Sequence, residues 1–520
     1  MHPDREVLFK NISFSVPTGK KANLIGDNGT GKSTLLKIIA GELMPSEGEI
    51  ITGDKPYYIP QHFGQYDEMP VARMLGIDKK IEALHAILNG DTSEANFDVL
   101  NEDWSIEERV KTALAEWGIS NIDLSASLHN LSGGEKTKVL LAGISIHSPS
   151  VILLDEPSNH LDVQGRRLLY EFIEETKATV LLVSHDRTML NLIDYTCELT
   201  GHGVEVYGGN YEFYKEKKEE KLNALYAQMD EKEKELRQAR RTAQQVSERK
   251  QRSDSRGKKK VKEGGIPRIM LNTIRNRAEA SASKLKGIHS DKIEDVNKEL
   301  KEIHQQIAEK EELKVTFENS NLHKGKILVE AKGVNYGYAE DMLWMSPLSF
   351  QLRSGERISV IGANGSGKTT LLQLILGNIL PREGEIIKGD FSYLYMDQEY
   401  SDIDNRLTVL EQVQRCNSRS LLDHELKVLL HRFLFPYDMW DKSSGNLSGG
   451  ERIRLLFCCL IVSNNIPDMF ILDEPTNNLD IQSLNIITSA LKDYKGTILV
   501  ISHDQYFKDE IGIERYIELE

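Results

Sequence analysis

The chain repeats itself, and this internal repeat limits its fold more than any other feature of the sequence. Gly26–Ser33 reads GDNGTGKS, and Gly362–Thr369 reads GANGSGKT, 336 residues later. The motifs LSGGE, DEP and SHD also recur in the same order, at Leu131 and Leu447, Asp155 and Asp473, and Ser184 and Ser502. The sequence therefore predicts two copies of one α/β domain, separated by a middle segment.

The two halves differ in two places. The offset between matching motifs falls from 336 at the first motif to 316 at LSGGE, so the first half has an insertion between about Gln61 and Leu131. Lys79–Leu88 and Ser105–Trp117 read as amphipathic helices, which predicts a helical arm; a solvated spacer is the alternative. The first half also starts late, because Met1 aligns with Gly337. The opening strand of the second half, Ile327–Val334, has no counterpart in the first.

Composition excludes several classes of protein. A chain of 520 residues predicts two or three domains. It contains no apolar run near the roughly 18 residues that a membrane-spanning helix needs, and no secretory signal is visible at Met1. Four cysteines form neither a disulfide framework nor a zinc spacing, which predicts a reducing cytoplasm. The net charge of −15 argues against nucleic-acid binding by the whole surface.

Each half carries a loop of the form G-x-x-x-x-G-K-[ST] between a short apolar run and a helical pattern, the setting of a phosphate-binding loop. Glycines let backbone N–H groups turn inward on a polyphosphate, the lysine reaches the terminal phosphates, and the hydroxyl binds Mg²⁺. The nucleotide contacts predicted from this pattern are Gly26, Asn28, Gly29, Gly31, Lys32, Ser33 and Thr34, and Gly362, Asn364, Gly365, Gly367, Lys368, Thr369 and Thr370.

Acidic pairs and histidines follow apolar strands in both halves. In each pair the first carboxylate suits Mg²⁺, and the second is placed to polarise the attacking water. A single such histidine is more often structural, but its recurrence favours contact with the γ-phosphate. A glutamine that closes a Tyr-rich strand is predicted to sense metal and water; an ordinary exposed amide is the alternative. The predicted catalytic residues are Glu156, Glu474, His185 and His503, and the predicted metal-binding residues are Ser33, Gln61, Asp155, Thr369, Gln398 and Asp473.

LSGGE is the signature of the ATP-binding-cassette ATPases, and both halves resemble that family. In it two cassettes face each other head to tail, and each ATP lies between one phosphate loop and the other cassette's signature. The resemblance implies two sites. Site one contains the phosphate loop of the first half and is completed by Ser448, Gly449 and Gly450. Site two contains the phosphate loop of the second half and is completed by Ser132, Gly133 and Gly134. These residues open helices whose N–H groups can bind a γ-phosphate. Family members also stack adenine on an aromatic residue; Tyr338 fits this role, whereas His2 stands at the matching position of the first half.

The middle segment has the pattern of two long helices. Apolar residues recur at intervals of three and four, interrupted by Lys232, at Leu222, Leu225, Met229, Leu236, Ala239, Ala243 and Val246, and again at Ile293, Val296, Leu300, Ile303 and Ile307. Such narrow stripes predict an antiparallel coiled coil. Its turn is expected near Gly257–Pro267, where glycines and a proline break the pattern.

Charge is distributed unevenly along the chain. Residues 247–286 contain 13 Lys plus Arg and 4 Asp plus Glu, a net +9 on a chain of −15, which leaves −24 for the rest. This predicts a basic tip that engages phosphates while the acidic body stays away from them. A solubilising charged linker is the alternative, but a tether needs neither a heptad pattern nor a reversal of sign.

Tandem cassettes joined by a charged helical hairpin resemble the ABC-F proteins, cytoplasmic ATPases that bind ribosomes. The resemblance implies a hairpin that enters the tRNA exit site and contacts P-site tRNA and rRNA near the peptidyl-transferase centre. The tip residues Gly264–Met270 and Asn276–Ala280 resemble those of antibiotic-resistance members, which displace drugs from the ribosome. The resemblance also implies ATP and Mg²⁺ as cofactors, and a monomer that closes its two cassettes on each other.

The sequence thus predicts three parts: a first cassette at 1–210 with an arm at about 62–130, a hairpin linker at 211–322 with its basic tip at about 247–286, and a second cassette at 323–520. Three other functions are alternatives. One is a housekeeping translation factor of the same family. Another is the ATPase subunit of a membrane transporter, which leaves the basic hairpin unexplained. The third, a DNA-repair or chromosome-organising ATPase, would carry a coiled coil within a cassette, or zinc cysteines.

Overall fold

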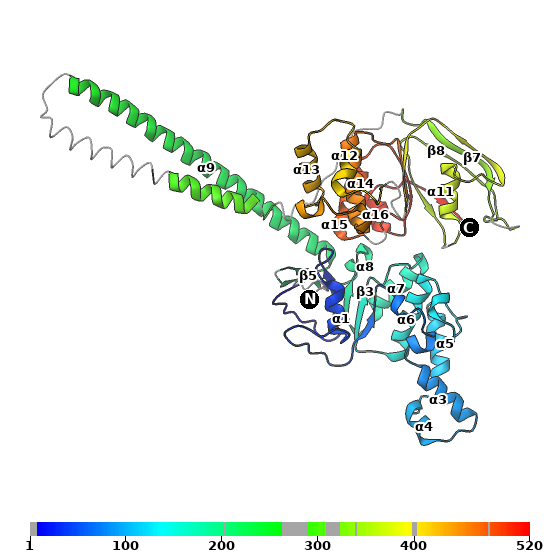
Figure 1. Cartoon of the computed structure of the whole chain (residues 1–520). Coiled ribbons are helices and arrows are strands. Elements are labelled where there is room, and N and C mark those ends of the chain that lie inside the picture. Colours follow the sequence, from blue (N-terminus) through cyan, green and yellow to red (C-terminus); the bar gives the residue numbers. More distant parts are fainter. Residues whose placement is uncertain are drawn as a thin grey trace. The chain divides into compact units, whose positions relative to one another are not determined.

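The computed structural model describes residues 8–201, 203–262, 287, 290–304, 306–307, 323–337, 341–363, 365–397, 403–476 and 479–519. The chain divides into two compact units (Figure 1). One unit contains Met1–Glu212 together with Leu313–Glu520, and therefore both halves of the repeat. The other contains Phe213–Glu312, the middle segment.

A six-stranded sheet in the order β2-β3-β4-β1-β5-β6 forms the centre of the first half. Its neighbours pair in parallel except β6, which runs antiparallel to β5. The inner strands are continuous apolar runs because helices cover both faces. The strands are β1 (Lys21–Ile25), β2 (Tyr57–Ile59), β3 (Val151–Asp155), β4 (Thr179–Val183), β5 (Thr196–Thr200) and β6 (Gly203–Tyr207). The helices are α1 (Lys32–Ile39), α2 (Val71–Met74), α3 (Asp78–Leu88), α4 (Glu94–Leu100), α5 (Ile106–Glu116), α6 (Gly133–His147), α7 (Val163–Glu175) and α8 (Arg187–Asn191), with 3₁₀ turns η1 (Gly64–Tyr66) and η2 (Leu128–Asn130).

The insertion in the first half is helical. Helices α3 and α5 occupy the two segments predicted as amphipathic helices, and α4 is a further helix that the pattern did not indicate. Figure 1 shows α3 and α4 projecting beyond α5. The projection is tied to its base by Lys80, whose Nζ lies 2.9 Å from Asp103 Oδ2, and by His85, whose Nε2 lies 2.5 Å from Glu107 Oε1.

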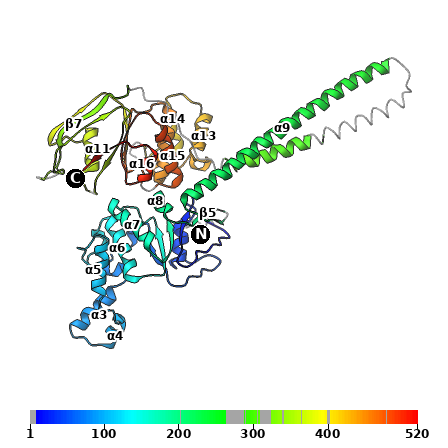
Figure 2. The same ribbon diagram turned by 180° about the vertical axis from the view of Figure 1, so that it is seen from behind.

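The second half contains two sheets. A parallel sheet has the order β11-β12-β13-β9-β14, and a separate antiparallel sheet has the order β10-β7-β8. Figures 1 and 2 show β7 and α13 at opposite ends of this half. The strands are β7 (Ile327–Asn335), β8 (Leu348–Arg353), β9 (Arg357–Ile361), β10 (Glu383–Lys388), β11 (Tyr393–Met396), β12 (Met469–Asp473), β13 (Thr497–Ile501) and β14 (Arg515–Glu518). The helices are α11 (Lys368–Leu376), α12 (Val409–Arg415), α13 (Asp423–Arg432), α14 (Gly449–Ser463), α15 (Ile481–Asp493) and α16 (Gln505–Glu510), with 3₁₀ turns η3 (Tyr437–Met439) and η4 (Ser444–Asn446).

The described residues of the first half form no counterpart of the antiparallel sheet. Residues 47–51 read EGEII, as do residues 383–387 at the start of β10, yet only the second copy is a strand. The middle strand β7 is the one without a counterpart in the described part of the first half, and both β8 and β10 pair with β7. A segment with no neighbouring strand to pair with gains little stability from an extended conformation, and residues 47–51 are accordingly irregular. Ile51 is consequently 87% exposed, whereas Ile387, its counterpart in β10, is 45% exposed.

The middle unit is an antiparallel helical pair. Helix α9 (Tyr211–Lys262) is followed, within the described residues, by a helix over 290–304. Lys232 Nζ lies 2.6 Å from Glu299 Oε2, and Lys292 Nζ lies 3.3 Å from Glu235 Oε1. Residues later in α9 thus contact residues earlier in the return limb, so the two limbs run in opposite directions. The antiparallel pairing predicted from the sequence is confirmed for these residues.

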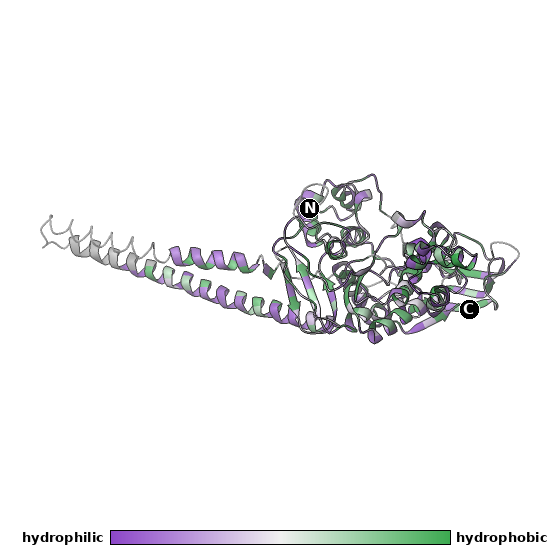
Figure 3. Cartoon of the chain, turned by 90° about the horizontal axis from the view of Figure 1, so that it is seen from below, coloured by the Kyte–Doolittle hydropathy of each residue, from purple (hydrophilic) through white to green (hydrophobic). Residues whose placement is uncertain are grey.

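The predicted apolar stripes form the contact between the two limbs. Along α9 the stripe positions are half-buried while most of their neighbours are exposed, and on the return limb Val296, Leu300 and Ile307 are buried. Figure 3 shows hydrophilic and hydrophobic segments alternating along α9. Lys232, the interruption of the stripe, also lies at the contact, where it bonds Glu299.

The described residues correct only the first part of the predicted turn. The pattern placed it near Gly257–Pro267, but α9 remains helical through Gly257 and ends at Lys262. A single glycine costs a helix only about 1 kcal/mol, and the lysines around it favour helix. The remainder of the predicted turn and the tip residues Gly264–Met270 and Asn276–Ala280 lie outside the described residues.

Candidate functional site

The two phosphate loops share one geometry. Lys32 Nζ donates to the backbone oxygens of Gly26 at 2.7 Å and of Asp27 at 3.0 Å. Lys368 makes the matching bonds, of 2.9 and 3.0 Å, to the second loop. Each ammonium group is therefore held over its loop at the N-terminus of a helix, α1 or α11, where an anion is favoured. Burial lowers the pKa of both lysines, and the carboxylates near them partly oppose this shift.

Glycine is required immediately before each of these lysines. Gly31 and Gly367 have φ of 93° and 86°, a left-handed conformation. A Cβ atom on Gly31 would lie 2.9 Å from the ring of Phe9, and one on Gly367 would lie 3.3 Å from the ring of Trp344. An aromatic ring thus packs beneath each loop, a contact that the sequence did not predict.

The remaining loop residues occupy the positions that the motif predicts. They lie in the loops or in the first turns of α1 and α11: Asn28, Gly29, Ser33 and Thr34, and Gly362, Gly365, Thr369 and Thr370. Four residues named above, His2, Tyr338, Asn364 and Gln398, lie outside the described residues. Their contacts with adenine, phosphate or metal stay predictions.

A hydroxyl, a carboxylate and a tyrosine meet at the end of β3. Ser33 Oγ donates to Asp155 Oδ1 at 3.1 Å, and the hydroxyl of Tyr58 donates to Asp155 Oδ2 at 3.2 Å. The second half repeats the arrangement with Thr369, Asp473 and Tyr395, at 3.0 and 3.5 Å. Burial raises the pKa of both aspartates, and the hydroxyl bonds partly offset this shift. Sequence reasoning missed the tyrosines, although each stands three residues before the predicted glutamine.

These residues fit a magnesium ion bound with a nucleotide. Mg²⁺ takes one or two protein oxygens and completes its octahedron with phosphate oxygens and water. The side chains of Ser33 and Asp155, and of Thr369 and Asp473, offer such a pair of oxygens. Within the described ranges no cluster of three or more His, Cys, Asp or Glu could hold a metal without the nucleotide.

Glu156 and Glu474 occupy strained and buried positions. Both have φ of 51°, a left-handed conformation that is costly for a residue with a side chain. Glu156 Oε1 and both carboxylate oxygens of Glu474 have no hydrogen-bond partner among the described residues. A buried carboxylate oxygen without a partner costs free energy, so Glu156 Oε1 and the two oxygens of Glu474 are available to accept a bond from a water or a ligand.

The surroundings of the two glutamates differ. Burial, together with nearby Asp155, raises the pKa of Glu156 to about 8. Burial raises the pKa of Glu474 only to about 7, because Arg166 of the first half opposes the shift. Arg166 lies on α7 with its Nη1 atom 3.5 Å from Asp186 Oδ2. The matching position of the second half is Leu484, which carries no charge.

The structure brings each predicted histidine to its glutamate. His185 N donates to Glu156 Oε2 at 3.2 Å, and His185 Nε2 lies 3.4 Å from Glu156 Oε1. His503 Nε2 lies 3.2 Å from Glu474 Oε1. Burial lowers the pKa of both histidines to about 4, so both are neutral at pH 7. His185 Nδ1 is buried without a hydrogen-bond partner in the described part of the chain. Contact with a γ-phosphate stays a prediction.

Each LSGGE motif begins a helix. Ser132 caps α6 and Ser448 caps α14, and in both helices the glutamate of the motif returns a bond to the cap backbone. The glutamate at the end of the motif therefore has a local structural role, because Glu135 and Glu451 each stabilise the first turn of their helix. The two glycines follow the cap with their N–H groups at the helix N-terminus.

Side chains from both halves line one small cavity of about 70 Å³. The first half contributes Asn28, Gln61, Glu156 and His185, and the second half contributes Thr476 and Asp504. The predicted glutamine Gln61 therefore lies with the acidic and histidine residues of its own half, as its placement at the end of a strand required. The signature residues are not among those that line this cavity, so their role across the interface stays a prediction.

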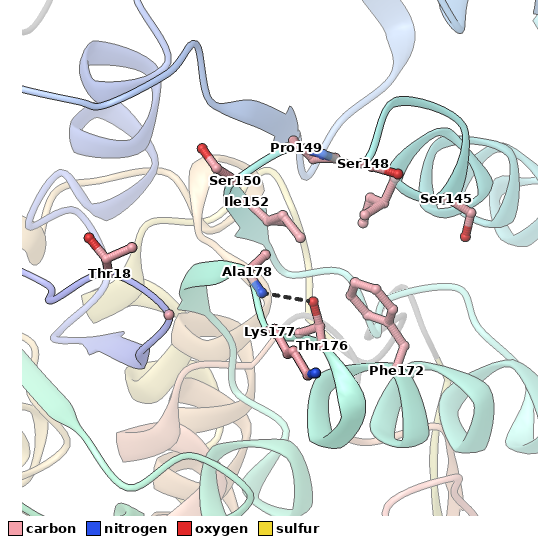
Figure 4. A pocket seen from close by; sticks show the side chains of 12 residues that line it. Thr18, Ser145, Ser148, Pro149, Ser150, Ile152, Phe172, Thr176, Lys177 and Ala178 are labelled. Carbon is pink, nitrogen blue, oxygen red and sulfur yellow. Dashed lines mark hydrogen bonds between the residues drawn. The ribbon is translucent and has the colours of Figure 1, made fainter.

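A larger cavity, of about 410 Å³, lies elsewhere in the first half (Figure 4). It opens beside the first residues of β3 and β4, between Ile152, Phe172 and Ala178. The backbone N–H of Ala178 donates to Thr176 Oγ1 at 3.3 Å. Ligands of open parallel sheets bind at the carboxyl ends of the strands. This cavity is at the amino ends, and it takes no part in the site described above.

Comparisons with known proteins agree with this geometry. The family model described as ABC transporter matches residues 9–159 and 345–477. The chain is 31% identical to the energy-dependent translational throttle protein EttA of Escherichia coli O6:H1, over 98% of this chain and 89% of EttA. It is 29% identical to ABC transporter F family member 2 of Arabidopsis thaliana, over 98% of this chain and 74% of the relative.

Solved structures show the same fold. The archaeal ribosome recycling factor aABCE1, in complex with the ribosomal stalk protein aP1, superposes with a TM-score of 0.57 at 21% identity, over 97% of this chain and 84% of that one. At this identity the likeness concerns the fold alone. Every helix among the described residues is too short or too polar to cross a membrane.

Proposed function

Because the chain belongs to the ABC-F family of tandem ATP-binding-cassette ATPases, we propose that it is a cytoplasmic ribosome-binding ATPase whose linker hairpin acts on translation. In this proposal residues 1–210 and 323–520 are the cassettes, and residues 211–322 are the hairpin. ATP binding closes the cassettes on each other, and hydrolysis separates them. The hairpin enters the ribosome near P-site tRNA and the peptidyl-transferase centre and is then withdrawn.

The observation that carries this proposal is the helical pair. Its limbs are joined by Lys232 with Glu299 and by Lys292 with Glu235, so the described part is a defined antiparallel arm rather than a loose tether. Residues 247–286 contribute a net +9 to a chain of −15. Positive charge at the end of a long arm favours contact with nucleic-acid phosphates. A transporter subunit has no use for such an arm.

Roles in hydrolysis follow from the contacts of each side chain. Lys32 and Lys368 bind the terminal phosphates, and the hydroxyl–carboxylate pairs hold Mg²⁺, which neutralises charge on the phosphates. Glu156 and Glu474 orient and polarise the attacking water, for which their unpartnered oxygens are available. His185 and His503, neutral and beside these glutamates, donate toward the γ-phosphate. Gln61 and Gln398 complete the metal and water contacts, and Tyr338 stacks on the adenine of site two.

The signatures complete the two sites. Ser448, Gly449 and Gly450 serve site one, and Ser132, Gly133 and Gly134 serve site two. Gln482 supports this pairing, because its Nε2 atom donates across the interface to Asp27 Oδ1 in the first phosphate loop at 2.7 Å. Two composite sites within one chain make a second copy unnecessary, so the protein works as a monomer.

Two biological roles are compatible with a ribosome-binding ATPase of this kind. We propose protection of the ribosome against antibiotics, on the resemblance of the tip sequence to resistance proteins. General regulation of translation is the second role, and the similarity to the protein named EttA, a translational throttle, favours it. The roles differ in what the tip contacts. Inhibitory concentrations measured in a susceptible host that expresses the protein separate the two roles. If the protein protects ribosomes, expression should raise the inhibitory concentration of at least one class among lincosamides, pleuromutilins, streptogramins, phenicols and macrolides. No change for any class would leave the regulatory role.

Ribosome binding itself is tested with a variant that cannot hydrolyse ATP. Glu156→Gln combined with Glu474→Gln should hold the cassettes closed, sediment with 70S ribosomes in the presence of ATP and arrest growth. A matched control adds Lys32→Ala and Lys368→Ala, which remove ATP binding and should leave the protein free of ribosomes. A glutamine variant that binds ATP yet sediments alone would refute the proposal.

A further inference from the structure

One face of α15 touches site one at two points. Gln482 Nε2 donates to Asp27 Oδ1 at 2.7 Å, and Asn485 Oδ1 accepts from Arg187 Nη2 at 2.6 Å. Residues three apart lie on the same face of a helix. Helix α15 belongs to the second cassette, whereas Asp27 and Arg187 belong to the first. Both cassettes lie in one compact unit.

The two contacted residues belong to two different segments of site one. Asp27 is part of the phosphate loop, and its backbone oxygen accepts from Lys32 Nζ at 3.0 Å. Arg187 begins α8, two residues after His185, which in turn bonds Glu156. A single helix of the second cassette therefore contacts both the phosphate loop and the segment that follows the histidine of the same site.

Arg187 is anchored more firmly than an ordinary surface arginine. It is 1% exposed, it pairs with the carboxylate of Glu510 on α16, and its guanidinium lies 5.2 Å from the ring centroid of Tyr506. A buried cation with a charged partner holds its position strongly, because separation leaves both charges without partners in a poorly solvated place. Movement of α8 away from α15 and α16 is therefore costly.

Among the described residues, site two shows no matching pair of hydrogen bonds from α7. The repeat places Ala363 where the first loop has Asp27, and Gln505 where α8 has Arg187. Gln505 bonds Asp509 of its own helix at 2.8 Å. On α7, the counterpart of α15, the residue matching Asn485 is Arg167, whose side chain is 80% exposed and bonds Glu171 of the same helix. None of these residues can reproduce the contacts of α15.

We propose that α15 is a one-sided clamp which grips site one through Asp27 and Arg187, and that site one consequently releases nucleotide more slowly than site two. Asp27 and Arg187 are positioning residues: they hold the phosphate loop and the histidine segment in place. The inference rests on the assignment of two ATP sites in the proposed function, but not on ribosome binding. It assigns site one to holding the cassettes together while site two exchanges its nucleotide.

Release of a fluorescent ATP analogue from the purified full-length protein tests this clamp. The Glu156→Gln, Glu474→Gln background prevents hydrolysis, and Mg²⁺ is present throughout. Displacement by excess ATP should show two phases, and Lys32→Ala should remove the slow phase while Lys368→Ala removes the fast one. The double substitution Asp27→Ala, Arg187→Gln introduces the residues that stand at the matching positions of the second half. It should accelerate the slow phase about tenfold, because two hydrogen bonds and a buried pair are lost. The fast phase should change less than about twofold.

Matched variants separate the clamp from a general loss of structure. Gln482→Ala removes one bond on a half-buried position and should accelerate the slow phase about threefold with an unchanged melting temperature. Gln164→Ala and Arg167→Ala, at the corresponding positions of α7, should change neither phase. Loss of the slow phase in the Lys368→Ala variant, or equal acceleration of both phases by Gln482→Ala, would overturn the proposal. Ribosomes are absent from the assay, so its outcome is independent of whether the protein binds them.

Discussion

His185 Nε2 lies 3.4 Å from Oε1 of Glu156, and the repeat reproduces this pair as His503 and Glu474 at 3.2 Å. In both sites a neutral imidazole stands beside a buried glutamate in a strained conformation. The charges around the two pairs are not the same. Arg166 extends from the first cassette toward Glu474 and has no counterpart near Glu156.

The first prediction concerns pH. Glu156 and Glu474 must be ionised to polarise water, and each is protonated below its pKa, so each site should lose activity as the pH falls through that value. In the Glu474→Gln variant, which leaves site one, the ATPase rate should rise with pH around an inflection near 8. In the Glu156→Gln variant, which leaves site two, the inflection should lie near 7. Steady-state ATPase rates between pH 5.5 and about 9.5 measure both.

Arg166 provides the control for this difference. Arg166→Gln in the Glu156→Gln background should move the inflection of site two upward, because a cation that lowers the pKa of Glu474 is lost. The same substitution should leave the inflection of site one in place. Identical inflections in the two single-site variants, unmoved by Arg166→Gln, would contradict the electrostatic account.

The second prediction separates the hairpin from the ATPase. Leu300 is buried between the two limbs, so Leu300→Ala should destabilise their pairing by about 3 kcal/mol. Hydrogen exchange should speed up in α9 and in residues 290–304, and ribosome binding should weaken. The basal ATPase rate should be unchanged. Lys298→Ala, on an exposed position of the same limb, should affect none of these quantities. A fall in ATPase rate with intact exchange protection would argue against the separation.

The third prediction compares one residue in two settings. Ile50 and Ile386 occupy the same position of the repeat, but only Ile386 lies in a sheet, in register with Ala331 of β7. Ile386→Ala should cost the second cassette about 1–2 kcal/mol of stability, because Ile386 packs against the core beneath the sheet. Ile50→Ala should cost the first cassette less than about 0.5 kcal/mol, the usual range of a surface substitution. Thermal unfolding of the two variants makes the comparison, and equal losses would show that the first cassette also uses this position in its core.

Much of the local organisation was predictable from the sequence alone. The phosphate loops, the strands that end in Asp155 and Asp473, and the antiparallel limbs of the hairpin follow from glycine spacing, apolar runs and heptad stripes. These patterns act over a few turns or strands, and they recur in register. The place of Glu135 and Glu451 in their capping boxes was equally readable from the motif, although only the nucleotide contacts of the signature were predicted.

Other features depended on residues far apart in the sequence. Phe9 beneath Gly31, Tyr58 on Asp155 and the cavity shared by Glu156 and Thr476 each join segments that only the packing of sheet and helices brings together. The expected start of the turn was wrong, because Gly257 lies within α9, which ends at Lys262 inside the predicted range. A local signal was outweighed by the helix-forming residues around it.

By itself, the sequence determined that the chain contains two ATP-binding cassettes and a helical pair, because each motif has a local physical requirement that few other sequences meet. The tertiary structure decided how the two sites differ. Arg187, Asp27 and Arg166 stand in the repeat as single unmatched residues with no local pattern to mark them. Their partners Asn485, Gln482 and Glu474 lie in the other cassette, so their role follows only from the contacts and charges that folding places around them.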